Sequence, residues 1–159
     1  MYERNVARRI LDHFGMLADN APTDLIEIAR VQGVDIQPLD PDDNEASGWF
    51  RNTQNGPVIF INQKRSHAHQ RFTLAHELGH YFLKHGDAAR DTAAQLRTRH
   101  PNEISANRFA AELLMPKQKV EGLLAEGYSQ REMARIFDVS NEAMGYRLEN
   151  LGNEYDREF

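Results

Sequence analysis

The sequence contains no cysteine among its 159 residues. This absence excludes disulfide bonds and the thiolate-rich ligand sets of structural zinc sites. Any bound metal must therefore be held by histidine and carboxylate side chains, which are the ligand types of open catalytic sites. A chain without cysteine is also compatible with a reducing cytoplasm.

Long apolar runs and an excess of basic residues are missing as well. No apolar run approaches the roughly 18 residues needed to cross a bilayer, and residues 1–10 lack the apolar centre of a signal peptide. We therefore expect a cytoplasmic protein without a membrane partner. The net charge of −5 supplies no overall basic field that would attract nucleic acid. No pattern in the sequence predicts an oligomeric state.

The length and composition fit a globular protein with one substantial core. Hydrophobic residues make up 40% of the chain and charged residues 27%, the balance of an ordinary soluble domain. We expect residues 1–118 to form the main domain, and residues 119–159 to form a helical extension packed on it.

Apolar spacing and turn residues predict an α+β fold. A helix is expected over residues 2–17, and a second over 24–32, capped by Thr23-Asp24 and stopped by Gly33. In the second helix the inward-facing residues should be Leu25, Ile26, Ile28 and Ala29.

Three short strands should follow, at residues 34–38, 47–52 and 57–62. The turn over residues 52–56 contains Asn55-Gly56, a strong hairpin signal. The third strand is apolar enough to be covered on both faces. These features predict a small, mostly antiparallel three-stranded sheet that packs on the next helix.

That helix, predicted over residues 66–84, carries His76-Glu77-Leu78-Gly79-His80 between apolar flanks. Residues four apart lie on one face of a helix, so His76 and His80 can bind a single ion. Zinc suits two imidazole nitrogens. Glu77 is too close in sequence to be a comfortable third ligand. It is well placed to take a proton from water at the metal, the role of such a glutamate in metalloproteases.

The alternative is that this pattern arose by chance and that both histidines are ordinary surface or core residues. The apolar flanks argue against it, because a buried helix does not carry two histidines and a glutamate without partners for them. Gly79 lies inside this helix, where glycine costs about 1 kcal/mol relative to alanine. That cost is explained if another backbone or a substrate passes close to Gly79. The helix should end at Gly86.

A third ligand is expected from the helix over residues 102–116, because a catalytic zinc usually takes three protein ligands and leaves one position to water. Glu103 and Asn107 share the apolar stripe of this helix. Glu112 is nine residues from Glu103 and so lies half a turn round. Glu103 is therefore the expected ligand, and Glu112 should be solvent-facing or ion-paired. His100 is a weaker candidate because Pro101 separates it from the helix. Asn107 is either a partner of a ligand or a packing amide.

The C-terminal segment predicts two further helices. Ser129 and Glu132 form a capping box for a helix that runs to Phe137, and residues 141–151 form a second helix after a short turn. This arrangement resembles a helix-turn-helix, but residues 129–152 contain three arginines against four acidic residues, a net charge of −1. A recognition helix that neutralises phosphates should be basic. We therefore expect a packed helical pair or a docking surface for a protein, and not a DNA-binding unit. Its core should be Met133, Ile136, Phe137, Met144 and Leu148.

Two stretches closely resemble the ImmA/IrrE family of metallopeptidases: Arg71-Phe-Thr-Leu-Ala-His-Glu-Leu-Gly-His80, and residues 103–116 with Ala106-Asn-Arg-Phe-Ala-Ala-Glu-Leu-Leu-Met-Pro116. The family's sequence pattern is also matched by further segments: residues 22–29, the strands containing Ser47-Gly48 and Ile59–Asn62, and residues 134–152. The resemblance thus covers nearly the whole chain. One departure is Ser105, where the family usually has an acidic residue, but this position is not the expected ligand.

The resemblance implies a zincin-like fold in which a small sheet packs on the His-Glu-x-x-His helix. It implies a zinc endopeptidase with His76, His80 and Glu103 as metal ligands and Glu77 as the general base. Family members cleave a helix-turn-helix repressor and thereby derepress genes of a stress response or a mobile element. The alternative is a regulatory binding module that keeps the fold and holds a repressor or DNA without catalysis. The presence of Glu77 favours the enzyme, because a binding module needs no base beside the metal.

Two features stay open at this point. Residues 87–101 are polar and weakly patterned, so they form either a flexible loop or a fraying helix; this loop or the C-terminal helices could gate the activity. A second group that stabilises the oxyanion is needed besides the metal. The sequence spacing does not distinguish between Tyr81, His85, Arg108 and Tyr128 for this role.

Overall fold

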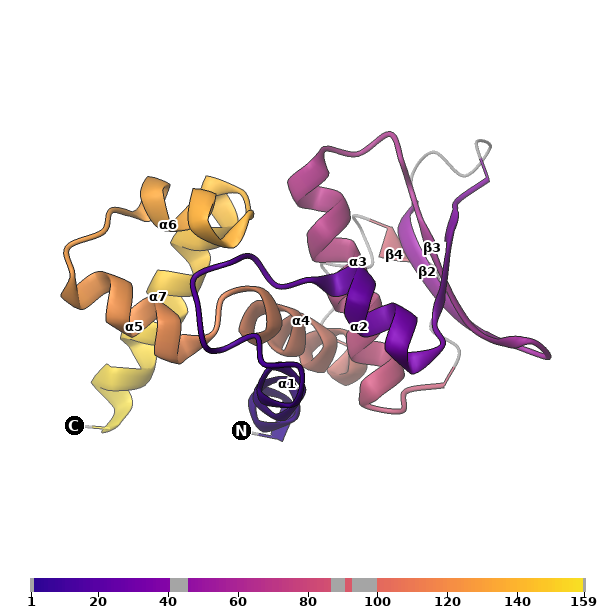
Figure 1. Cartoon of the computed structure of the whole chain (residues 1–159), viewed down its shortest axis with the longest axis horizontal. Coiled ribbons are helices and arrows are strands. Elements are labelled where there is room, and N and C mark those ends of the chain that lie inside the picture. The colour runs from indigo at the N-terminus through magenta and orange to yellow at the C-terminus, as the bar shows by residue number, and fades with distance from the viewer. Residues whose placement is uncertain (1, 41–45, 87–90, 93–99, 159) are drawn as a thin grey trace.

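The computed structural model describes residues 2–40, 46–86, 91–92 and 100–158 and confirms the α+β fold. A small sheet lies at one end of the molecule, and α5 (Lys117–Ala125), α6 (Gln130–Phe137) and α7 (Asn141–Glu158) lie at the other (Figure 1). Between them run α3 (His67–Phe82) and α4 (Pro101–Leu114). One continuous hydrophobic core joins these parts. None of the described helices is both long and apolar enough to cross a membrane.

The sheet has the strand order β1-β3-β2-β4. Its centre is the predicted hairpin, in which β2 (Ala46–Thr53) and β3 (Gly56–Ile61) pair antiparallel. β1 (Asp35–Pro38) pairs with β3 in parallel, and the two-residue β4 (Asp91–Thr92) pairs antiparallel with β2. The predicted three-stranded, mostly antiparallel sheet is therefore confirmed, and β4 extends it by one short strand.

The hairpin differs from the prediction in two details. Its turn consists of Gln54 and Asn55, so Gly56 already belongs to β3. β3 is not fully covered on both faces, because Ile59 is buried whereas Val58 and Phe60 are only half-buried. The strand therefore has one fully buried face, which packs into the core.

The first two helices follow local signals. In α2 (Leu25–Gln32) the side chain of Asp24 accepts a hydrogen bond from the Glu27 backbone, and Gly33 ends the helix in the left-handed region. These ends are the predicted ones, but Ile26 is 60% exposed, so its inward placement is wrong. α1 (Tyr2–His13) is shorter than predicted, because the chain turns at Gly15 with a φ of +68°.

Two helix boundaries later in the chain are also corrected. α3 ends at Phe82, and the chain turns at Lys84, with a φ of +59°, before it reaches Gly86. α7 continues beyond residue 151 to Glu158. α5 was not predicted. Most of the segment over residues 87–101 lies outside the described residues, apart from β4 and the start of α4.

The C-terminal helices are tied to the rest of the molecule by charged groups. Glu112 of α4 is 1% exposed and forms an ion pair with the buried Arg147 of α7. The Nε atom of Arg4 lies 3.5 Å from the same carboxylate oxygen. The ion-paired alternative for Glu112 is therefore correct and the solvent-facing one is wrong. The capping box of α6 and the core of the helical pair are as predicted.

Gly79 sits where α3 and α4 meet. A Cβ atom at Gly79 would lie 3.2 Å from both the Cα and the carbonyl oxygen of Ala106, and 3.1 Å from the ring of Phe109. Such distances are shorter than ordinary van der Waals contacts, so a side chain here would require the neighbouring atoms of α4 to move. The glycine inside α3 is thus explained by the close passage of the α4 backbone, one of the two explanations that the sequence suggested.

Replacing Gly79 with alanine should destabilise the protein by roughly 1–3 kcal/mol, because the added methyl group forces α3 and α4 apart. Gly122 provides the control: it is exposed in α5 with nothing near its Cβ position. Gly122→Ala should stabilise the protein by about 0.5–1 kcal/mol through the lower entropy of the unfolded chain. Chemical denaturation measures both values, and a stabilised Gly79→Ala variant would contradict the close approach of the helices.

Candidate metal centre

The buried half of α3 presents both histidines of the motif on one face. Ser66 caps the helix by accepting a hydrogen bond from the backbone of His69. Every residue from Thr73 to His80 is buried, including His76, Glu77 and His80. Polar side chains at such positions require partners within the protein or on a bound ion.

Three side chains converge beside this face. The Nε2 atoms of His76 and His80 lie 3.1 Å apart, and they lie 3.0 Å and 3.1 Å from the carboxylate oxygens of Glu103. In a tetrahedral zinc site with bonds of about 2.0–2.1 Å, neighbouring ligand atoms are separated by roughly 3.3 Å. The three residues that the sequence selects are therefore close to the spacing that one small cation requires.

The outer nitrogens of both rings are engaged by other side chains. The Nδ1 atom of His76 lies 2.8 Å from Oδ1 of Asn107, and Nδ1 of His80 lies 2.9 Å from Nδ1 of His85. An amide oxygen can only accept, so the proton of His76 resides on Nδ1 and the lone pair of Nε2 faces Glu103. Burial, followed by the neighbouring His80, lowers the pKa of His85, which favours a neutral ring that can accept in the same way.

These contacts define what the centre can hold. Two imidazole lone pairs and a carboxylate that face one another at about hydrogen-bond distance form a donor set that a divalent cation stabilises. Asn107 and His85 orient the rings for this role, as partners of metal-ligating histidines commonly do. The contact made by Asn107 supports the ligand-partner alternative for this residue.

Glu77 lies at the interface of α3 with the sheet and is fully buried. A Cβ atom at Gly48 of β2 would lie 3.5 Å from Cγ of Glu77 and only 2.4 Å from Cγ2 of Thr73. A residue with a side chain would push β2 away from α3, so Gly48 is needed for this approach. A glycine inside a strand is a recognised signal for such close packing.

The other sequence candidates have different contacts. The ring of His100 accepts a hydrogen bond from the backbone of Asn102 and so caps α4. Tyr81 donates to Gln32 at 3.3 Å, Arg108 lies 4.0 Å from Glu3, and Tyr128 packs against the core. Of the four candidates for oxyanion stabilisation, His85 is the one in hydrogen-bond contact with a histidine of the centre.

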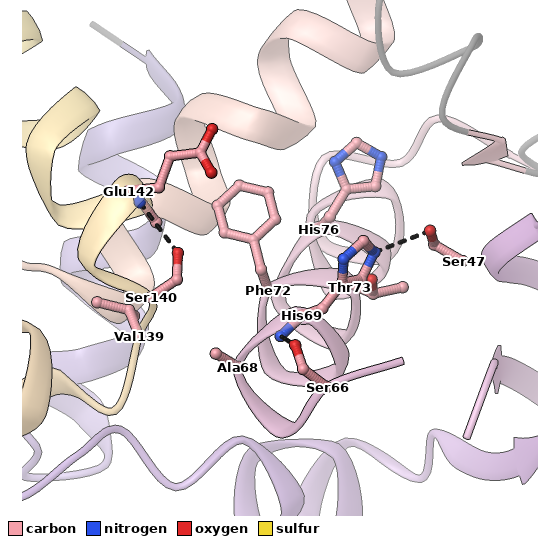
Figure 2. A pocket seen from close by; sticks show the side chains of 11 residues that line it. Ser47, Ser66, Ala68, His69, Phe72, Thr73, His76, Val139, Ser140 and Glu142 are labelled. Atoms are coloured by element: carbon pink, nitrogen blue, oxygen red, sulfur yellow. Dashed lines mark hydrogen bonds between the residues drawn. The ribbon is translucent and has the colours of Figure 1, made fainter. Parts of the chain in front are cut away.

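Sequence reasoning missed a pocket that opens beside His76. It lies between α3, β2 and the turn that joins α6 to α7, and its volume is about 320 Å³ (Figure 2). His69 and Ser47 form a 2.9 Å hydrogen bond on its β2 side. Partial burial lowers the pKa of His69, so its ring is neutral near pH 7. The turn lies about 65 residues from His76 along the chain, and for that reason no local sequence pattern could reveal the pocket.

Removal of one imidazole should abolish metal binding. The purified wild-type protein should hold about one ion per chain, and His76→Ala should hold almost none, because two ligands do not retain the ion. His13→Ala, at an exposed position in α1, is the matched control. Elemental analysis measures the metal content. A chelator should lower the melting temperature of the wild type and leave that of His76→Ala unchanged. Stoichiometric metal in His76→Ala would rule out this ligand assignment.

Asn107→Ala should weaken metal affinity about 10–100-fold, because His76 loses the group that fixes its ring. Asn107→Asp retains an acceptor for the Nδ1 proton and should restore most of the affinity. Asn150→Ala, at an exposed site on α7, is the control. Competition with a chromophoric chelator gives the affinities, and equal affinities for Asn107→Ala and Asn150→Ala would make Asn107 a packing residue.

Comparison with known proteins agrees with this geometry. The sequence profile described as "IrrE N-terminal-like domain", of the peptidase M78 family, matches residues 29–149. The chain is 26% identical over 145 residues to "Metallopeptidase ImmA" of Bacillus subtilis (strain 168), which covers 89% of this chain and 85% of the relative. It is 35% identical over 102 residues to "Radiation response metalloprotease IrrE" of Deinococcus deserti, which covers 57% of this chain and 35% of that relative. The chain therefore belongs to the ImmA/IrrE family of metallopeptidases.

Proposed function

We propose that this protein is a cytoplasmic zinc-dependent endopeptidase that cleaves a DNA-binding helix-turn-helix repressor and so derepresses genes of a stress response or a mobile element. The observation that carries the proposal is the convergence of His76, His80 and Glu103 within 4.8 Å of one another, beside the buried Glu77. The stress-response part is supported by the name of one relative, a radiation response metalloprotease.

Zinc is the ion that best suits this donor set. Two imidazole nitrogens and one carboxylate are the ligands of one common class of catalytic zinc site, and an open fourth position distinguishes such sites from structural ones. A zinc ion held there would acidify water and polarise a peptide carbonyl.

Glu77 is the candidate general base. It follows His76 directly and lies between the ligand-bearing helix and β2. In this position Glu77 accepts a proton from the attacking water and returns it to the leaving amine, and a positioned carboxylate of this kind contributes typically about 10²–10⁴-fold to the rate. Burial also keeps bulk water away from the reacting groups.

The edge of β2 supports a peptide substrate. β2 passes close to α3 at Gly48, and on its outer side it is paired with β4 at Ala46 and Gly48. Beyond Gly48, no described strand pairs with this side of β2, and an extended peptide could add backbone hydrogen bonds there.

The charges on the helical pair favour a protein partner over DNA. Arg147 is one of three arginines in residues 129–152, and it is buried against Glu112 and the carbonyl oxygen of Met115. Arg131 and Arg135 are exposed, but the acidic side chains of Glu132 and Glu142 are exposed as well. This surface lacks the positive charge that phosphate contacts require.

Glu77→Gln tests the catalytic role. The variant should keep the zinc content of the wild type and cleave the repressor about 10²–10⁴-fold more slowly, because an amide cannot accept the proton. Glu149→Gln makes the same chemical change at an exposed position of α7 and should leave cleavage unchanged. Mass spectrometry of a purified helix-turn-helix repressor encoded beside this protein locates the cut and gives its rate.

A reporter gene under control of that repressor distinguishes the enzyme from a binding module. If Glu77→Gln derepresses the reporter as well as the wild type does, catalysis is not the function, and a protein that acts by holding its partner takes its place. Derepression by the wild type alone supports the peptidase.

A further inference from the structure

The pocket beside His76 is bounded by two parts of the chain that are distant in sequence. α3 contributes Ala68 and Phe72, and the turn between α6 and α7 contributes Val139, with Ala143 following in α7 (Figure 2). His76 is both a lining residue of this pocket and a candidate metal ligand. Any substrate whose carbonyl group lies at the metal therefore has this pocket directly next to it.

The chemistry of the walls is mainly apolar. Thr73 also lines the pocket, and the three lining serines make internal hydrogen bonds: Ser66 accepts from the backbone of His69, Ser140 accepts from the backbone of Ala143, and Ser47 pairs with the ring of His69. The apolar part of the lining is formed by Ala68, Phe72, Val139 and Ala143. A volume of about 320 Å³ accommodates the side chain of leucine, methionine or phenylalanine.

The charge of the pocket lining affects which substrate side chains can enter the pocket. Among the described residues that line the pocket, Glu142 is the one carboxylate, and it is exposed at the start of α7. An acidic side chain that approaches this pocket would meet a like charge and would also lose its own hydration. Apolar side chains have neither cost.

The outer wall is held firmly against α3. The Arg71 guanidinium donates to the carbonyl oxygen of Asp138 at 3.1 Å and to that of Thr23 at 3.2 Å. His67 lies 2.7 Å from the carboxylate of Asp138. These contacts fix the turn between α6 and α7 relative to the helix that carries the metal ligands, so the pocket has a defined shape.

We propose that this pocket receives one bulky apolar side chain of the peptide substrate, next to the scissile bond, and that the C-terminal helical pair thereby selects the substrate. Val139 and Ala143 are then specificity-determining residues, and Glu142 excludes acidic side chains. The proposal rests on the peptidase function proposed above.

Dipeptide hydroxamates test the proposal by binding alone. The hydroxamate group chelates the metal, and the adjacent residue is glycine, leucine, phenylalanine or glutamate. Isothermal titration calorimetry with the zinc-loaded protein should show leucine and phenylalanine compounds binding at least about tenfold more tightly than the glycine compound, because an apolar side chain leaves water. The glutamate compound should bind most weakly. Equal affinities across the series would overturn the proposal.

Two variants with matched controls assign the effect to the helical pair. Ala143→Leu fills the pocket and should remove most of the preference for leucine over glycine, whereas Ala125→Leu, exposed at the end of α5, should preserve it. Glu142→Gln should reduce discrimination against glutamate a few-fold, and Glu149→Gln should not. The glycine compound should bind all four variants as it binds the wild type, which shows that folding and metal are intact. A preference that survives Ala143→Leu would place the side chain elsewhere.

The hydroxamate experiment distinguishes a failure of the pocket proposal from a failure of the proposed peptidase function. Hydroxamate binding requires the metal and the pocket but no cleavage, so the side-chain preference can be present even if no repressor is cut. Conversely, cleavage of a repressor together with equal hydroxamate affinities would leave the peptidase function standing and overturn the pocket proposal.

Discussion

The close contact between α3 and α4 is the constraint on which the candidate centre depends. Gly79 allows the backbone of Ala106 to approach to van der Waals distance, and Glu103 lies nearly one turn before Ala106 on the same helix. A wider separation of the helices would move the carboxylate away from His76 and His80. A glycine inside a helix costs about 1 kcal/mol. At this position it permits the close contact between α3 and α4 that brings Glu103 to the two histidines.

The two glutamates of α4 show how their surroundings decide their roles. Glu112 is buried against Arg147 and Arg4, which supply the positive charge that a buried carboxylate needs. Glu103 instead faces two imidazoles whose outer nitrogens are engaged by Asn107 and His85. A divalent cation would compensate the negative charge of Glu103, as the two arginines compensate that of Glu112. The same residue type on one helix therefore forms an ion pair at one position and contributes to the candidate metal centre at another.

The parts of this architecture that depend on neighbours in sequence were predictable. Asp24 and Gly33 mark the ends of α2, the Ser129–Glu132 capping box begins α6, and the spacing within helices selected Glu103 over Glu112. These signals act within a few residues and owe little to the rest of the fold.

The features that were missed or wrong depend on partners far along the chain. Ile26 has the hydrophobicity of a core residue, yet no element covers most of its side chain within the described structure. The pairing of Arg147 with Glu112 spans 35 residues, and the proximity of the α6–α7 turn to His76 spans still more. Periodicity describes one element at a time, so it cannot show which elements meet.

In the proposed function, α3 contributes both to catalysis and to substrate selection. Its buried face carries His76, Glu77 and His80, and its first half forms one wall of the pocket and anchors the opposite wall through Arg71. Arg71 is five residues before His76, so its contact with Asp138 lies about one and a half helical turns from the first candidate metal ligand. In the proposed arrangement the C-terminal helices form one wall of the substrate pocket, so a change in their position would alter the shape of that pocket.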